Sequence, residues 1–206
     1  TYIIGLLTLL WSCDDFVDVQ PINQINSDNY FNSEADYQAA LVGAYDLLQA
    51  SYVNVMISIM ASDDALCGGE NATDVPGFQE VDDMRHGVVN DQLRSVWNWM
   101  YAGVNRCNYI FEYRDKTAFD GKENVLGQAA FLRAYYYFEL LKFFGDIPMP
   151  LDKRVNFGEA ENFSRSSKAE VYAQIEQDLT YAVANLPDVQ AEKGRVTKGA
   201  AQALLG

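Results

Sequence analysis

Apolar residues recur every three or four positions along most of this chain, which is the spacing of one face of an α-helix. The pattern predicts helices over residues 33–48, 52–60, 91–111, 123–144, 167–187 and 197–204. The run at 52–60 is short enough to fit a strand as well, and a helix is favoured. Since no pair of segments predicts a convincing hairpin, the expected fold class is all-α, with long irregular loops.

Capping residues mark where two of these helices begin. Ser33 is followed by Asp36, and Ser167 by Glu170. At this spacing the two side chains bond each other's backbone N–H groups in a capping box. Pro187 ends the helix that Ser167 begins, because proline has no N–H to continue the helical hydrogen bonds.

The segment 131–150, FLRAYYYFELLKFFGDIPMP, is the most informative part of the sequence. Residues 131–144 include ten aromatic or aliphatic side chains. A helix that is apolar on most sides must be enclosed by other helices. The three tyrosines 135–137 are therefore expected to pack inside the fold. Gly145 supplies the backbone conformation that ends such a helix, and Pro148 prevents the helix from resuming.

The two long connections, 61–91 and 145–165, interrupt the helical pattern. The first contains five glycines or prolines and eight acidic residues, but only one basic residue. Long loops in compact domains are often functional. This loop combines a ring, carboxylates and a guanidinium that together can stack on a sugar and hydrogen-bond it. A solvated, self-repelling loop is an equally good interpretation. The candidate ligand residues here are Asp74, Phe78, Asp82 and Arg85.

Trp97 and Trp99 lie on the predicted helix at 91–111 and point in roughly opposite directions, about 200° apart. Trp97 belongs to the apolar stripe and is expected in the core. Trp99 is a further candidate ligand residue, and it shares its face with Gln92, Ser95, Ala102, Gly103 and Arg106. Either its ring is exposed for sugar stacking or it packs against a neighbouring helix, and packing is favoured.

The amino-acid composition disfavours some classes of binding partner. The 206 residues are 49% hydrophobic, enough for one sizeable core or two small ones. With 15 basic and 29 acidic residues, the net charge of −14 disfavours binding to nucleic acid or to anionic lipid. The aromatic content of 13% suits neutral polyhydroxylated ligands, although core packing also needs aromatic residues.

The first residues of the chain predict a lipid anchor. An apolar run from Tyr2 to Trp11 fits the hydrophobic region of a signal peptide. Leu10-Trp11-Ser12-Cys13 resembles a lipobox, with Trp11 in place of the usual small residue, and lipidation of Cys13 is favoured over a buried N-terminal element. The expected organisation is a signal-peptide remnant and lipobox at 1–13, a polar tether at 14–29 and one helical domain at 30–206.

The remaining cysteines, Cys67 and Cys107, make no zinc pattern, because the only histidine is His86 and no CxxC motif is present. They either pair in an envelope compartment or stay reduced, and reduced core packing is favoured. No cofactor is expected. The acidic pairs at 63–64 and 82–83 offer oxygen ligands for calcium but lack EF-hand spacing.

The helix at 167–187 also fits the second helix of a tetratricopeptide repeat. Ile175, Leu179, Ala182 and Pro187 stand at the spacing of that motif, and small residues there let paired helices approach. The repeat pattern alone supports a scaffold that binds peptide or protein ligands, and this is the alternative function.

Four segments in order resemble the SusD/RagB nutrient-binding lipoproteins. They are the lipobox-like Cys13 with its acidic follow-on, WNWMYAGVNRCNYIF, FLRAYYYFELLKFFGDIPMPL, and SRSSKAEVYAQIEQDLTYAVANLP followed by GRVTKGAAQALLG. The family elements read W-x-x-x-Y-x-x-I-x-R-x-N, then R-A-x-x-Y-F-x-L-x-x-x-F-G-D-x-P, then E-V-Y…DL…A…LP and G-R-x-T-K. Val104 stands where the family has Ile.

The resemblance implies an all-α, tetratricopeptide-like scaffold attached by lipid to the outer membrane and exposed at the surface. Such proteins bind glycan or peptide nutrients and deliver them to a SusC-like TonB-dependent transporter, without catalysis. The chain would be the N-terminal part of a typical member. An all-α glycosidase is a weaker hypothesis, since the acidic pairs are adjacent in sequence and unlikely to flank one scissile bond.

Overall fold

The helices expected from the hydrophobic pattern are present in the computed structural model, which describes residues 30–71 and 73–206. The signal-peptide remnant, Cys13 and the tether lie outside the described residues. The helices are α1 (Glu34–Asp46), α2 (Ser51–Met60), α3 (Pro76–Asp82), α4 (Asp91–Glu112), α5 (Lys122–Phe144), α6 (Lys168–Asn185) and α7 (Lys198–Leu205), with 3-10 turns η3 (Leu47–Ala50) and η4 (Ala160–Asn162). The helical interpretation of 52–60 and the all-α fold class are confirmed.

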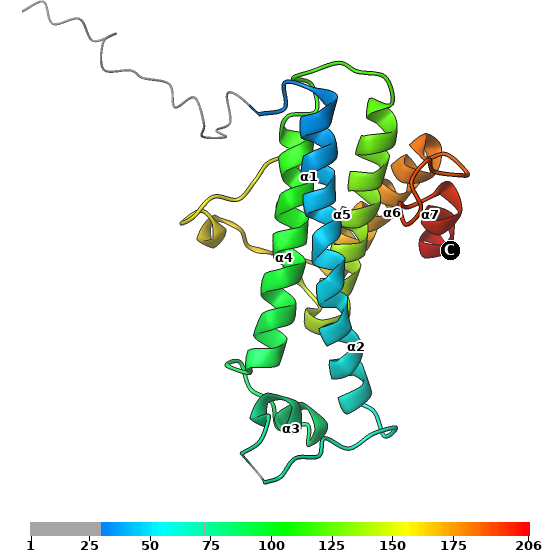
Figure 1. Ribbon diagram of the computed structural model, residues 1–206. Helices are drawn as coiled ribbons and strands as arrows, with labels where there is room; N and C mark the ends of the chain where they lie inside the picture. The colour runs from blue at the N-terminus through cyan, green and yellow to red at the C-terminus, as the bar shows by residue number, and fades with distance from the viewer. Residues whose placement is uncertain (1–29, 72) are drawn as a thin grey trace, which may run out of the picture. The chain divides into compact units, whose positions relative to one another are not determined.

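Residues 31–206 form one unit. In it α1, α4 and α5 pack against one another, and α5 packs on α6, which packs on α7 (Figure 1). Small side chains let the last pair approach, since Ala182 of α6 and Ala201 of α7 are fully buried in one cluster. This arrangement agrees with the helix pairing that the repeat pattern predicts. None of the helices in the described part of the chain has the length and apolar character needed to cross a bilayer.

The predicted capping residues act at the helix starts. The Asp36 carboxylate accepts hydrogen bonds from the Ser33 N–H and hydroxyl, both at 2.9 Å. At α6, Glu170 accepts from the Ser167 N–H at 2.7 Å, and the Ser167 hydroxyl accepts from the Glu170 N–H at 3.4 Å. These bonds satisfy donors that a helix leaves unpaired at its first turn.

Helix α5 is enclosed as its sequence predicts. Tyr136 and Tyr137 have no exposed surface, and Tyr135 is half-buried. The Tyr136 hydroxyl donates to the Ala44 carbonyl of α1 at 2.6 Å, so a polar atom in the interior is satisfied. Gly145 ends the helix with φ of +71°, in the range that favours glycine.

Two of the charged residues that interrupt the apolar run of α5, Arg133 and Glu139, are buried, whereas Lys142 is exposed. Arg133 donates through its Nε and one terminal nitrogen to the two oxygens of Asp178 in α6, each at 2.8 Å. Its other terminal nitrogen donates to Asn108 Oδ1 at 3.0 Å. Its guanidinium carbon lies 4.1 Å from the ring centroid of Phe111. Arg133 therefore connects α4, α5 and α6 in the interior.

One feature differs from the expectation. Ile147–Pro148 (β1) and Arg165–Ser166 (β2) form a short antiparallel pair, although the sequence predicts no hairpin. The acidic connection at 61–91 contains the short helix α3. The strands are two residues long, so no periodic pattern could reveal them.

Cys67 and Cys107 are both free thiols. Cys107 is fully buried in α4, and this burial raises the pKa of its thiol far above the ordinary value. The interpretation of Cys107 as a reduced core residue is therefore confirmed.

Candidate functional site

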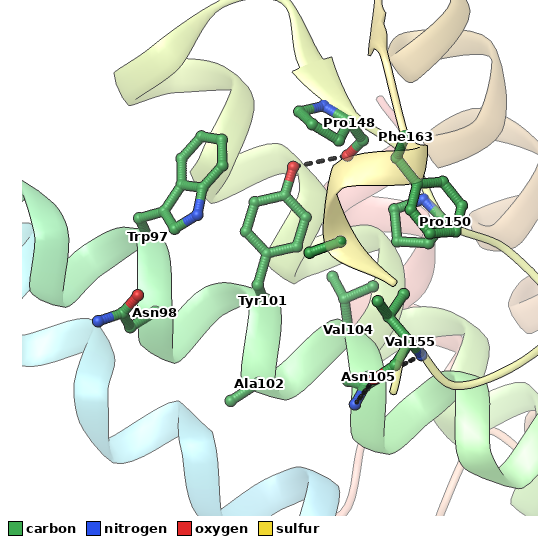
Figure 2. Close-up of a pocket in the computed structure, with 11 residues that line it drawn as sticks. Trp97, Asn98, Tyr101, Ala102, Val104, Asn105, Pro148, Pro150, Val155 and Phe163 are labelled. Atoms are coloured by element: carbon green, nitrogen blue, oxygen red, sulfur yellow. Dashed lines mark hydrogen bonds between the residues drawn. The ribbon is translucent and has the colours of Figure 1, made fainter. Parts of the chain in front are cut away.

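An apolar groove lies between α4 and the connection that follows α5 (Figure 2). It encloses about 320 Å³. Trp97, Tyr101 and Asn105 recur every fourth residue on α4 and so share one face of the helix. The facing wall comes from the connection at 145–165 and contains Pro148, Pro150, Val155, Ala160 and Phe163.

Hydrogen bonds across the groove hold the connection against α4. The Tyr101 hydroxyl donates to the Pro148 carbonyl at 2.6 Å. Asn105 makes a paired contact with Val155, donating to its carbonyl at 3.3 Å and accepting from its N–H at 2.7 Å. Asn108 donates to the Pro150 carbonyl at 3.0 Å. Asn105 and Asn108 thus both bond the connection, and their partners form the groove wall.

The tyrosines under the groove are hydrogen-bond donors and not acids. Burial raises the pKa of both Tyr101 and Tyr137 well above the ordinary value. Tyr137 donates to the same Pro150 carbonyl as Asn108. These neutral hydroxyls fix carbonyl groups whose residues, being proline, have no backbone N–H to pair elsewhere.

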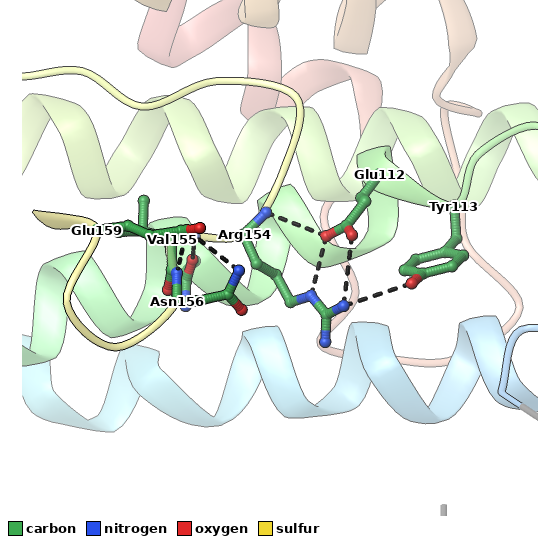
Figure 3. A network of polar contacts seen from close by, with 7 residues as sticks. Glu112, Tyr113, Arg154, Val155, Asn156 and Glu159 are labelled. Carbon is green, nitrogen blue, oxygen red and sulfur yellow. Dashed lines mark hydrogen bonds and ion pairs between the residues drawn. The ribbon is translucent and has the colours of Figure 1, made fainter. Parts of the chain in front are cut away.

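A second contact fixes the far end of the connection (Figure 3). Arg154 donates to Glu112 of α4 from its backbone N–H at 3.1 Å and from Nε at 2.9 Å. The Arg154 guanidinium also lies 3.9 Å from the ring centroid of Tyr109. Burial by itself raises the pKa of Glu112, but the hydrogen bonds and charge of Arg154 outweigh it, so the net pKa lies below the ordinary value. The Glu112 carboxylate therefore stays ionised and paired at neutral pH.

The structure corrects the prediction for Trp97, which the apolar stripe placed in the core. It is half-buried and lines the groove. Its ring centroid lies 4.7 Å from that of Tyr101 and 5.0 Å from that of Phe144, the latter edge-on. The indole is thus held by two neighbouring rings and still borders the groove, an arrangement that suits stacking of an apolar ligand face.

The candidates from the acidic loop lie outside this groove. Asp82 accepts from the Cys67 N–H at 2.8 Å, and Asp74 from the Glu70 N–H at 3.2 Å. Arg85 pairs with Asp83, and Phe78 is half-buried in α3. The two carboxylates thus stabilise the loop backbone, and their contact with a ligand stays a prediction. Across residues 30–71 and 73–206, no three His, Cys, Asp or Glu side chains gather closely enough to hold a metal ion.

Trp99 is 40% exposed and does not line the groove. The ring of Tyr136 fills the space over Gly103, and contact of Trp99 with a ligand stays a prediction. Sequence reasoning missed the groove itself, because it requires α4 to face a connection about fifty positions further along the chain. A sequence pattern that could have indicated the groove is the four-residue spacing of Trp97, Tyr101 and Asn105.

The fold and the groove define the class of protein: an all-α scaffold with an aromatic-lined groove of the kind that small ligands occupy. Residues 15–206 match the family model SusD-like, described as starch-binding and associating with the outer membrane. SusD-like protein P2 of Formosa agariphila is 30% identical over the whole of this chain, which spans 41% of that relative's length. The chain belongs to the SusD-like family.

Solved structures agree in fold. A laminarin binding SusD-like protein has a TM-score of 0.75 at 30% identity, covering 84% of this chain and 39% of its own. A SusD-like protein from Bacteroides fragilis has a TM-score of 0.76 at 28% identity, covering 91% of this chain and 36% of its own. Surface glycan-binding protein A from Bacteroides uniformis has a TM-score of 0.72 at 26% identity, covering 84% of this chain and 41% of its own.

Proposed function

We propose that this protein binds glycans or oligosaccharides at the outer membrane and delivers them, without catalysis, to a SusC-like TonB-dependent transporter. The observation that carries the proposal is the groove along Trp97 and Tyr101, in a fold shared with a laminarin binding relative. The indole offers a flat apolar surface for the C–H face of a sugar ring. The amide of Asn98 borders the same space and supplies a donor and an acceptor for hydroxyl groups.

Substitution of Trp97 by alanine is expected to weaken glycan binding about five- to thirtyfold, which corresponds to the loss of about 1–2 kcal/mol. Trp97→Phe keeps a ring and should retain part of the affinity. Affinity electrophoresis against a polysaccharide panel, followed by calorimetry with the best ligand, measures the change. Thermal unfolding of each variant reports whether the fold is intact.

Tyr172→Ala is the matched control, because this ring is exposed on α6 and lies outside the groove. It should bind like the unmodified protein. If folded Trp97→Ala binds every glycan as well as Tyr172→Ala does, the groove is not the site. Binding of peptides but no glycans would favour the alternative, a tetratricopeptide-type scaffold for peptide or protein ligands.

Attachment to the outer membrane, with the protein exposed at the surface, is proposed through lipid on Cys13. The support is the lipobox-like sequence Leu10-Trp11-Ser12-Cys13 and the description of the family as outer-membrane associated. Metabolic labelling with palmitate is expected to mark the protein in membrane fractions and to be lost in Cys13→Ala. Equal labelling of Cys13→Ala would remove this assignment.

A further inference from the structure

A second groove, next to the first, collects positive charge. It encloses about 640 Å³ and shares Trp97 with the apolar groove. Aromatic side chains form part of its lining, and two arginines and a histidine border it, with no aspartate or glutamate among the lining residues. These three residues are His86, Arg94 and Arg165.

This collection of charge stands out in a chain with a net charge of −14. Six of the eight arginines form an ion pair with an aspartate or glutamate, namely Arg85, Arg106, Arg114, Arg133, Arg154 and Arg195. Within the described residues, Arg94 and Arg165 have no such partner. Acidic side chains outnumber basic ones almost twofold in this chain. Two guanidinium groups that lack an acidic partner and border one groove can therefore bind an anionic ligand there.

The backbone under both arginines is held in place. Arg94 lies in the first turn of α4, where its N–H donates to the carbonyl of Asn90, and the Asn90 side chain caps the helix. Arg165 lies in β2, paired with Pro148 of β1. Pro148 also lines the apolar groove, so the strand pair joins the two grooves. Between them lies Trp97, at one end of the residues in Figure 2.

We propose that the glycan bound by this protein is acidic, carrying carboxylate or sulfate groups that Arg94 and Arg165 recognise. The inference rests on the proposed function. Guanidinium groups bind carboxylate and sulfate oxygens through paired N–H donors. Trp97, Phe143 and Phe144 offer apolar surface for the sugar ring that carries the charge. A glycan chain can cross Trp97 with one residue in the apolar groove and an acidic residue in the cationic groove.

The test compares three oligosaccharides of equal length in calorimetry: a uronate oligosaccharide, a sulfated oligosaccharide and a neutral one. The unmodified protein is expected to bind at least one acidic probe tenfold or more tightly than the neutral probe, with an affinity that falls as salt is raised. Arg94→Gln combined with Arg165→Gln should remove the salt dependence and reduce the affinity for the acidic probes to that for the neutral probe. Comparison of the uronate and the sulfated oligosaccharide identifies whether carboxylate or sulfate is recognised.

Lys193→Gln is the control, since Lys193 is exposed, lies outside both grooves and changes the net charge in the same direction. It should keep the acidic preference. Binding of neutral glycans alone would overturn this inference and leave the proposed function standing, whereas failure to bind any glycan would overturn both. An unchanged preference in the folded double arginine variant would also overturn it. Each single arginine variant provides a second measurement if the double variant does not fold.

Discussion

Asp178→Ala is expected to destabilise the protein by about 3–5 kcal/mol, because it leaves the guanidinium of Arg133 buried without a counterion. Both side chains are almost entirely inaccessible, with 5% and 6% of their surfaces exposed. Two direct hydrogen bonds to Arg133 are lost together, and the remaining polar partner, Asn108, carries no charge. Urea unfolding followed by circular dichroism measures the change.

Two further variants separate charge from shape. Asp178→Asn keeps the volume but loses the charge, so it should cost less than the alanine variant and more than a surface substitution. Glu192→Ala breaks the Arg195 pair, in which the Glu192 side chain is 72% exposed, and is expected to change stability by less than about 1 kcal/mol. A similar small effect for Asp178→Ala would show that water reaches Arg133 and that the interior pair contributes little.

Gly103→Ala is expected to destabilise the protein by about 2–3 kcal/mol, because it forces α4 and α5 apart. A Cβ atom at this position would lie 2.5 Å from the nearest ring carbon of Tyr136. That ring cannot move aside, since Tyr136 is fully buried and its hydroxyl is bonded to the Ala44 carbonyl of α1. The helical propensity gained on replacing glycine, about 1 kcal/mol, does not offset the overlap.

Gly43→Ala is the matched control for that substitution. Gly43 lies within α1, and an added Cβ would meet no atom within 4 Å. It should leave stability unchanged or raise it by up to about 1 kcal/mol, since only propensity acts. Chemical denaturation of both variants under the same conditions measures the difference, and equal stability of the two would mean that α4 and α5 can separate at no cost.

Sequence periodicity predicted the helices well because their stability depends on burying one face, and burial leaves a repeat in the sequence. The limits of α4 and α5 fell within a residue or two of the expected ones. The polar exceptions were harder to interpret. Arg133 and Glu139 interrupt an apolar run, and sequence alone could not tell solvent exposure from interior pairing. Glu139 is buried and accepts from Asn54 at 2.7 Å, a residue eighty-five positions earlier.

The site was predicted less well than the fold. Asp74, Phe78, Asp82 and Arg85 were chosen because they combine suitable chemical groups in one loop. Composition within a loop does not say whether a carboxylate faces a ligand or its own backbone, and Asp74 and Asp82 accept from N–H groups in the same loop. Trp97 was assigned to the core because an apolar stripe does not distinguish a core residue from one that borders a groove.

By itself, the sequence determined the all-α class, the order of the helices and the resemblance to the SusD/RagB family, since each depends on local spacing and motif. Only the tertiary structure decided where a ligand surface lies. The groove joins Tyr101 to Pro148 and Asn105 to Val155, residues about fifty positions apart. Its outer wall is held by backbone carbonyls, which leave no mark in the sequence. Likewise, which arginines lack an acidic partner depends on distances in space, so Arg94 and Arg165 became distinct only once the chain was folded.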